Sequence, residues 1–543
     1  MKKNLASLVF PILLIFIFQI APQSFAQQIT LDDLVTYHKT SNFIKEFDIP
    51  IKERGLKGIT GDNHGNVWFY HATNSSSKII KMNADNKFEQ YDIPGKTMVE
   101  SPIVNLAGGQ IVFDDSRNAV WFTDARTNSI GKLDLESGKI WLVEIPTPKS
   151  GPMGLALSND KKTLWFTEIL ASKIARLDPE TNKIVEYSTG NDSGPTFLAF
   201  DENGILWVTQ SYAHNVIRIQ TELLDSVVVN GMSSFTLPKP EIFSPFGIAV
   251  ISHDGKQKMI VSDHGSSRVI LSDLDSLFQP FTSYWTSPSQ VYPQTLPGQI
   301  VTDKQGNVYF AQHGGNKITK IDANSGVMTE YDVPTGPLST VLFSTVSEDG
   351  AKVWFIEWAS NKIGYLDTTI PIPFNLNLQD EKITLDKSGS KTIDVTIRPE
   401  NNSTLSTNEV ELEVVGMTES GLSGIKYSAN PQRFNQEQDV HKSEIVLNAE
   451  NNAKPGTYTL MIESSSFESD KLRISQLYPV SIILDVPESV KIPSQSQDNK
   501  NVNLSSNENF ITKYLALLAA FGLIAFIIYR RINKSKNYKI KNS

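Results

Sequence analysis

Alternating apolar and polar positions recur along the first two thirds of the chain and predict short strands. One five-residue phrase, with a tryptophan or another large apolar residue at its second position, returns repeatedly; its clearest copies are residues 164–168 (LWFTE) and 353–357 (VWFIE). The copies end 42 to 53 positions apart, at His71, Asp124, Glu168, Gln210, Asp263, Gln312 and Glu357. A period of this length, built from short β-rich runs, is typical of a β-propeller.

Each repeat has room for four strands. In the third repeat they are predicted at residues 151–156, 164–168, 173–178 and 184–187, with Gly, Asn and Asp in the turns. Since the phrase occurs seven times, we expect an all-β fold with a seven-bladed β-propeller over residues 40–368.

The last repeat ends without a fourth strand, and a spare copy of that strand stands at the front of the propeller. Residues 46–50 (EFDIP) resemble the fourth strands that end at residues 91–94 (YDIP) and 331–334 (YDVP). We therefore expect an N-terminal strand, residues 43–50, to complete the last blade. Such closure removes an exposed sheet edge.

The alternation continues beyond the propeller without the tryptophan phrase. Runs at residues 391–397, 410–414 and 480–486 predict an immunoglobulin-like β-sandwich over residues 371–487. Residues 488–509 are polar and lack an apolar period, so we expect a flexible stalk.

The two ends of the chain predict its location. Residues 1–26 combine two lysines, an apolar run and a small-residue cleavage site, which indicates a signal peptide; an uncleaved anchor is the alternative. Residues 510–529 are long and apolar enough for a transmembrane helix, and residues 530–543 form a basic tail that stays on the cytoplasmic side. We expect a single-pass protein of the cell membrane with its N-terminal domains outside.

Composition narrows the function classes. The 543 residues carry a net charge of −9, which argues against a general nucleic-acid partner. The chain has no cysteine, which excludes disulfides and thiol catalysis.

The phrase-ending residues are the candidate site, because equivalent positions of a propeller lie in a ring around its channel. Four are acidic and could hold Mg²⁺ or Ca²⁺: Asp124, Glu168, Asp263 and Glu357. The candidate catalytic residues are Glu168, Glu357 and His71. Gln210 and Gln312 complete the ring, and His264 and His313, which directly follow ring members, could support it. The alternative is a purely structural polar lining bridged by water.

The repeat resembles the streptogramin lyase family, also called virginiamycin B lyases. The resemblance rests on residues 151–154 (GPMG), 165–168 (WFTE), 128–131 (NSIG) and 361–364 (NKIG). It implies a Mg²⁺-dependent elimination that opens the lactone ring of a cyclic peptide antibiotic, with histidines at a Pro-His-Gly place and a glutamate ending Trp-Phe-Thr-Glu. Glu168 and Glu357 match the glutamate place. The histidine place aligns with Lys57, Gln110, Met153, Thr196, Phe246, Gly298 and Leu338.

Two functions from different classes follow. The first is a surface protein that binds an extracytoplasmic ligand or envelope protein and is attached to the membrane by its C-terminal helix. The alternative is a metal-dependent enzyme, either a virginiamycin B lyase-like carbon–oxygen lyase or a lactonase-like hydrolase. A purely structural envelope role is a third possibility. A plugged channel would favour binding, and acidic side chains converging on one point would favour the enzyme.

Overall fold

The computed structural model describes residues 40–484 except 74–75, 96–107, 226–230, 237–243, 254, 275–280, 289–293, 337–338, 400–408, 417–423, 436–439 and 470–471. The predicted signal peptide (1–26), stalk (488–509), transmembrane helix (510–529) and basic tail (530–543) lie outside the described residues. Within the described residues, no helix is long and apolar enough to cross a bilayer. The described chain is almost entirely strand and turn, with η2 (Thr221–Leu223) a short 3₁₀ exception. The all-β prediction is confirmed.

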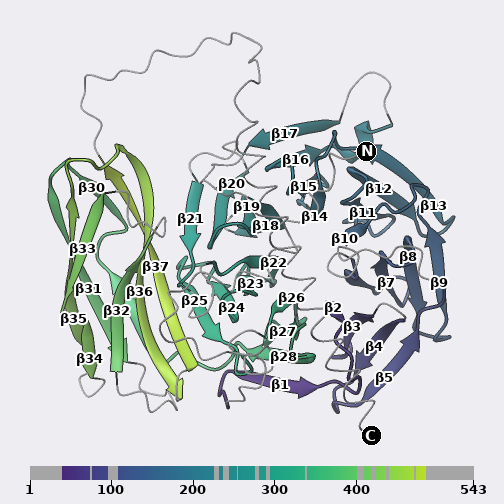
Figure 1. Cartoon of the computed structure of the whole chain (residues 1–543), viewed down its shortest axis with the longest axis horizontal. Helices are drawn as coiled ribbons and strands as arrows, with labels where there is room; N and C mark the ends of the chain where they lie inside the picture. The colour runs from purple at the N-terminus through teal and green to yellow at the C-terminus, as the bar shows by residue number, and fades with distance from the viewer. Residues whose placement is uncertain are drawn as a thin grey trace, which may run out of the picture. The chain divides into compact units, whose positions relative to one another are not determined.

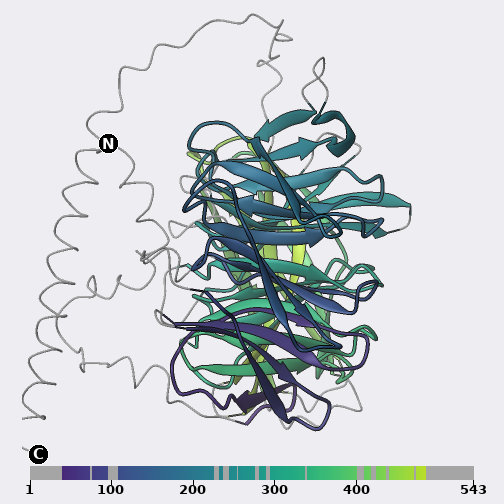
Figure 2. The ribbon, with the colours of Figure 1, turned by 90° about the vertical axis from the view of Figure 1, so that its right-hand side faces the viewer.

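Four-stranded antiparallel sheets make up the N-terminal part. Their first strands contact one another in the order β2, β6, β10, β14, β18, β22, β26 and back to β2. The sheets therefore surround a common centre as the blades of a propeller (Figure 1), and Figure 2 shows them from the side.

The blade strands have the following bounds in chain order. The first four sheets are β2 (Leu56–Gly61), β3 (Val67–Ala72), β4 (Ser77–Met82), β5 (Phe88–Asp92); β6 (Ile111–Asp114), β7 (Ala119–Asp124), β8 (Ser129–Asp134), β9 (Ile140–Glu144); β10 (Pro152–Leu157), β11 (Leu164–Glu168), β12 (Lys173–Asp178), β13 (Lys183–Ser188); β14 (Pro195–Phe200), β15 (Leu206–Gln210), β16 (Asn215–Ile219), β17 (Met232–Thr236). The next are β18 (Pro245–His253), β19 (Lys256–Asp263), β20 (Arg268–Asp273), β21 (Phe281–Trp285); β22 (Pro297–Thr302), β23 (Val308–Gln312), β24 (Lys317–Ile321), β25 (Met328–Asp332); β26 (Val341–Val346), β27 (Lys352–Glu357), β28 (Lys362–Asp367). The sheet of β26–β28 takes its fourth strand from β1 (Ile44–Asp48), which pairs antiparallel with β28.

A bulge shapes the inner strands near the centre. In β10, Pro152 pairs with Glu168 and Leu155 with Phe166, so the inner strand holds one extra residue. The same shift occurs in β14, β18, β22 and β26. At the bulge, a Cβ on Gly154 would lie 2.5 Å from the carbonyl oxygen of a residue in the next sheet. The glycine of the repeat is thus required by the close approach of neighbouring inner strands.

The tryptophans of the phrase fix the second strands. Three of them donate Nε1–H to an aspartate in the preceding turn at 2.9–3.1 Å: Trp68 to Asp62, Trp121 to Asp114 and Trp207 to Asp201. A cation on the third strand lies over the ring, as Lys132 does 5.4 Å from the Trp121 centroid. Each hydrogen bond to a charged acceptor contributes about 1.5–3 kcal/mol, in addition to burial of the indole.

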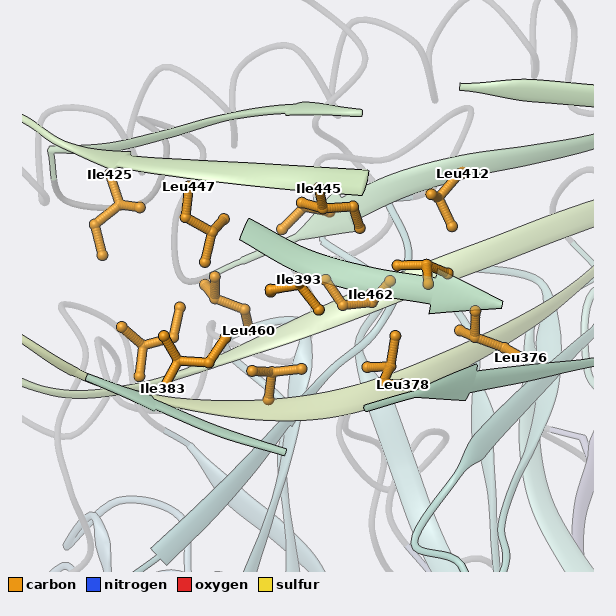
Figure 3. Close-up of a cluster of buried hydrophobic side chains, with 14 of the residues drawn as sticks. Leu376, Leu378, Ile383, Ile393, Leu412, Ile425, Ile445, Leu447, Leu460 and Ile462 are labelled. Atoms are coloured by element: carbon orange, nitrogen blue, oxygen red, sulfur yellow. The ribbon is translucent and has the colours of Figure 1, made fainter. Parts of the chain in front are cut away.

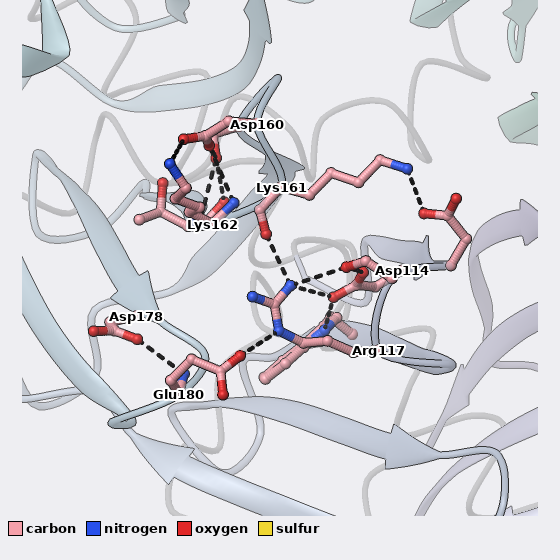
Figure 4. Close-up of polar contacts among 12 residues, drawn as sticks. Asp114, Arg117, Asp160, Lys161, Lys162, Asp178 and Glu180 are labelled. Carbon is pink, nitrogen blue, oxygen red and sulfur yellow. Dashed lines mark hydrogen bonds and ion pairs between the residues drawn. The ribbon is translucent and has the colours of Figure 1, made fainter.

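An arginine links two neighbouring sheets (Figure 4). Arg117 Nη1 donates to Asp114 at 3.0 Å and to the Lys161 carbonyl at 2.8 Å, and its Nε donates to Glu180 at 2.9 Å. Asp114 is fully buried, so the guanidinium neutralises a carboxylate that has no access to water. The hydrogen bond from Trp121 to Asp114 therefore depends on Arg117, which also connects this sheet to the next one.

Residues 374–484 form two further sheets around one apolar core, called here the C-terminal β-domain. One sheet has the order β29-β31-β35-β33, and the other includes β37, β36, β32 and β34, with β30 parallel to β37. Figure 3 shows apolar side chains of both sheets meeting, among them Ile393, Leu447 and Leu460. The strands are β29 (Phe374–Leu378), β30 (Lys382–Leu385), β31 (Ser390–Pro399), β32 (Glu409–Val415), β33 (Ile425–Asn430), β34 (Arg433–Asn435), β35 (His441–Ala449), β36 (Gly456–Ser469) and β37 (Leu472–Leu484).

The C-terminal β-domain continues a propeller sheet. Residues 328–331 of β25 pair antiparallel with residues 474–477 of β37, so one sheet runs from β22 to β34 (Figure 1). Met461 and Leu477 share a core with Trp285 and Met328. The sequence pattern predicts only the second half of β37, because its first half serves this junction.

Candidate functional site

The ring residues share one structural position, the last residue of each second strand. Their side chains are at most 2% exposed: His71, Asp124, Glu168, Gln210, Asp263, Gln312 and Glu357. The repeat therefore brings them to equivalent places, as the sequence predicts. They are buried within the ends of the blades instead of lying open at a channel mouth.

Glu168 lies in a small charged cluster. Lys173 Nζ donates to Glu186 at 2.7 Å, and Thr147 donates to the same carboxylate from its backbone N–H at 2.8 Å and its hydroxyl at 2.7 Å. Neither oxygen of Glu168 has a well-aligned donor among the described residues. Burial, and then the negative charge of Glu186, raise the pKa of Glu168 to about 7. This carboxyl is therefore close to half-protonated at neutral pH.

The sheet closed by β1 repeats the arrangement around Glu357. Glu46 accepts hydrogen bonds from Thr335 N–H at 2.8 Å and Oγ1 at 2.6 Å, and Lys362 lies 3.6 Å from it. Glu357 accepts a bond from Ser360 at 2.6 Å. Burial, and then the neighbouring Glu46, raise the pKa of Glu357 well above its usual range. The neutral form of Glu357 is therefore favoured beside this second carboxyl group.

A glutamine replaces the ring glutamate in the sheet of β22–β25. Gln312 Nε2 donates to Glu330 at 2.9 Å, and Lys317 pairs with the same carboxylate at 2.6 Å. The lysine–glutamate pair thus persists where the ring residue carries no charge. An amide can occupy this position because the ring residue forms its hydrogen bond within its own blade.

Each of the two ring aspartates lies beside an arginine side chain. Asp124 accepts from Tyr70 Oη at 3.2 Å and lies 3.5 Å from Arg126. Asp263 accepts from Arg268 Nε at 3.2 Å. Burial raises the pKa of Asp263, and the guanidinium of Arg268 opposes that shift.

The remaining ring members bond to backbone. His71 Nε2 lies 2.8 Å from the Glu53 carbonyl, and burial lowers the pKa of His71. Gln210 Nε2 donates to the Thr189 carbonyl at 3.0 Å. Both contacts tie a second strand to a loop, which is a structural use of the position.

The ring does not fit one shared metal ion. Within the described part of the chain, no three His, Asp or Glu side chains are placed to hold a cation together. The four carboxylates lie in separate blades, and two are already paired with arginine. Mg²⁺ or Ca²⁺ binding at Asp124, Glu168, Asp263 and Glu357 stays a prediction for a titration.

His264 and His313 do come together. Their ring centroids are 4.5 Å apart, and His264 stacks on Phe246 at 4.7 Å. His264 Nδ1 lies 3.0 Å from the Pro297 carbonyl. Burial lowers the pKa of His264 to about 4 and that of His313 well below its usual value. Both imidazoles are therefore neutral at physiological pH.

Aromatic side chains meet across the centre of the propeller. Phe197 of β14 and Phe343 of β26 have ring centroids 6.2 Å apart, although β18 and β22 separate these strands around the ring. Phe246 packs on Phe197 at 5.0 Å. Phe197 and Phe343 are both 5% exposed. We call these three residues the aromatic plug, because they connect inner strands that are not neighbours in the ring.

The strand register changes two of the seven histidine-place assignments. The residue directly after this place donates its backbone N–H to a threonine hydroxyl, as Gly154 does to Thr167. Gln110 donates to Thr123 in the same way, so Gln110 follows the place and Gly109 holds it. The assignment of Gln110 was therefore one residue too late, because the two consecutive glycines at 108 and 109 leave the repeat pattern ambiguous there. In the last sheet Val341 pairs with the ring residue Glu357, so Leu342 holds the place; the assigned Leu338 lies outside the described residues. No histidine occupies either corrected place.

Sequence reasoning missed the partners and the plug. The lysine–glutamate pairs lie on third and fourth strands, where they read as ordinary surface charges. Phe197 and Phe343 stand one residue after the histidine place, where three of the other repeats have glycine and two have glutamine. Aligning that position across repeats would have identified the plug.

Comparison with known proteins supports the type of propeller. Residues 31–257 match the virginiamycin B lyase family model. Among solved structures, a streptogramin B lyase is 24% identical, with a TM-score of 0.50 over 60% of this chain and 97% of that chain. Selenomethionine-substituted virginiamycin B lyase from Staphylococcus aureus is 23% identical, with a TM-score of 0.49 over 60% of this chain and 98% of that chain. A search of curated proteins found no match. The chain thus carries a virginiamycin B lyase-like β-propeller, and the structural likeness concerns the fold.

Proposed function

We propose that this chain is a membrane-anchored surface protein that binds an extracytoplasmic ligand or envelope partner. Its parts in this proposal are a signal peptide (1–26), a seven-bladed propeller (40–368) closed by an N-terminal strand (43–50), an immunoglobulin-like sandwich (371–487), a stalk (488–509), a transmembrane helix (510–529) and a cytoplasmic tail (530–543). A rigid propeller lifted off the membrane suits recognition, and the net charge of −9 disfavours nucleic acid.

The aromatic plug is the observation that carries this proposal. An enzyme of this shape needs a wet, accessible centre in which acid and base groups converge on a substrate. Here Phe197 and Phe343, from inner strands that are not neighbours in the ring, meet near the centre. The ring carboxylates are buried in separate blades, which further favours a surface for binding over a central active site.

The test offers the full-length protein a group B streptogramin with Mg²⁺ and follows the depsipeptide by chromatography and mass spectrometry. Elimination would give an isomer of unchanged mass and new retention time, whereas hydrolysis would add one water. We expect the depsipeptide to remain unchanged. A ring-opened product that disappears in an E168Q/E357Q variant would overturn the binding proposal.

The alternative is a metal-dependent lyase or a lactonase-like hydrolase. The Glu168 carboxyl favours it, because a pKa of about 7 suits a general base at neutral pH. In that case Glu357 and His71 would assist, supported by the His264–His313 pair. Calorimetric titration with Mg²⁺ and Ca²⁺ decides: saturable binding lost in a D124N/E168Q/D263N/E357Q variant would support the enzyme.

A further inference from the structure

A cleft lies where the propeller meets the C-terminal β-domain. It encloses about 490 Å³, within the range of about 300–1,000 Å³ typical of small-molecule sites. Its walls come from β24 and β25, residues 366–372, and strands β29 and β37. We propose that this cleft binds a neutral saccharide. This inference rests on the proposed binding function and gives it a ligand class.

The walls of the cleft are held in place by the junction. The β25–β37 ladder joins the two sides. Gln476 Oε1 accepts a hydrogen bond from Leu376 N–H at 2.8 Å, which fixes β29 against β37. Tyr478 Oη donates to Glu381 at 2.6 Å, which orients the tyrosine at the cleft. A preorganised site of this kind loses little entropy on binding.

The charges of the lining cancel. Among its described residues, Lys320 and Asp322 are the charged pair, 3.4 Å apart. Asp322 also accepts bonds from the backbone N–H and the hydroxyl of Ser325, both at 3.0 Å. The carboxylate is therefore already satisfied. An ionic ligand would find no uncompensated charge here, so a neutral one fits better.

The remaining lining suits a ring that carries hydroxyl groups. On β29, Asn377 is exposed while its neighbour Leu376 is buried, so the Asn377 amide faces away from the core of the C-terminal β-domain. A carboxamide donates and accepts at once, which matches a sugar hydroxyl. Val327 and Ile370 add apolar surface to the same cleft, against which the C–H face of a sugar ring can pack.

A peptide added as a strand fits less well. Such a peptide needs a free sheet edge for its backbone hydrogen bonds. The outer edge of β25 is already paired with β37, and the Leu376 amide on β29 is already bonded to Gln476. The cleft thus offers side-chain recognition of a compact ligand.

The test titrates full-length protein, in a detergent without sugar groups, with chitotriose, cellotriose and maltotriose, and detects binding by calorimetry and saturation-transfer NMR. We expect at least one trisaccharide to bind and an N377A variant to lose at least tenfold in affinity. The matched control is N448A, an exposed asparagine on β35 of the same sheet, which should bind as the unchanged protein does.

Two outcomes would overturn the proposal that this cleft binds a saccharide. One is that none of the three sugars binds; the other is that N377A binds as tightly as N448A. Neither touches the proposed binding function, which falls only if the depsipeptide is turned over. Retention on an immobilised glycoprotein, reversed by the free trisaccharide, would identify a glycan-bearing partner as the source. Binding of the free sugar alone would identify a soluble oligosaccharide.

Discussion

At the scale of single residues, Glu168 makes folding depend on pH. Its pKa is about 7 in the folded protein and near 4.5 when unfolded, so the folded state holds the proton more tightly. Its contribution to stability is fully present below pH 4.5 and is lost as pH rises to about 7. E168Q should therefore stabilise the protein more at pH 8 than at pH 5. We expect this difference in the free energy of unfolding, measured by urea denaturation against the unchanged protein, to be up to about 3 kcal/mol.

Glu144 provides the control for this substitution. It lies at the end of β9 and is exposed, so E144Q should change the stability equally at both pH values. If E168Q showed no pH dependence either, the pKa of Glu168 would be the same in the folded and unfolded states, and its carboxylate would be only a weak base at neutral pH.

The repeat spacing was sufficient to predict that the seven ring residues occupy equivalent places. It could not predict their burial, because the groups that surround Glu168 come from other strands and from the loop that holds Thr147. The pairing of His264 with His313 was likewise out of reach. It depends on how neighbouring blades approach each other, which no period along the chain records.

At the scale of elements, β1 stabilises the sheet that it closes. Ile44 is 3% exposed and packs with Phe355 and Leu366. We expect I44A to lower the free energy of unfolding by about 2–5 kcal/mol, because it leaves a cavity in the closing sheet. Its neighbour Lys45 points outward, so K45A should change stability by less than about 0.5 kcal/mol. Equal effects would mean that β1 does not carry the closure.

Strand positions followed from the alternation wherever a strand has one buried face. The second and third strands predicted at residues 164–168 and 173–178 coincide with β11 and β12. The pattern failed at β37, which begins at Leu472 although the prediction starts at residue 480. Its first half contacts the propeller on one side and β36 on the other, so several consecutive residues are buried and the alternation is lost.

At the scale of the whole described structure, the propeller and the C-terminal β-domain share one continuous sheet across their junction. Buried charges reinforce it: Arg473 lies 3.0 Å from Glu463, and its backbone N–H donates to Asp332 at 2.9 Å. Removing either partner would leave an uncompensated charge in the seam. The domains should therefore not move as independent bodies.

This continuity can be measured, because all eight tryptophans lie between residues 68 and 358. Tryptophan fluorescence thus reports unfolding of the propeller, including the core that Trp285 shares with the C-terminal β-domain. Leu477 belongs to the C-terminal β-domain but is fully buried against the propeller core. We expect L477A to lower the stability reported by the tryptophans by about 2–5 kcal/mol. L447A removes the same side chain from the domain's own core; a matching shift there would show that both domains unfold together. An unmoved tryptophan transition in L477A would mean that the shared sheet contributes nothing to the propeller.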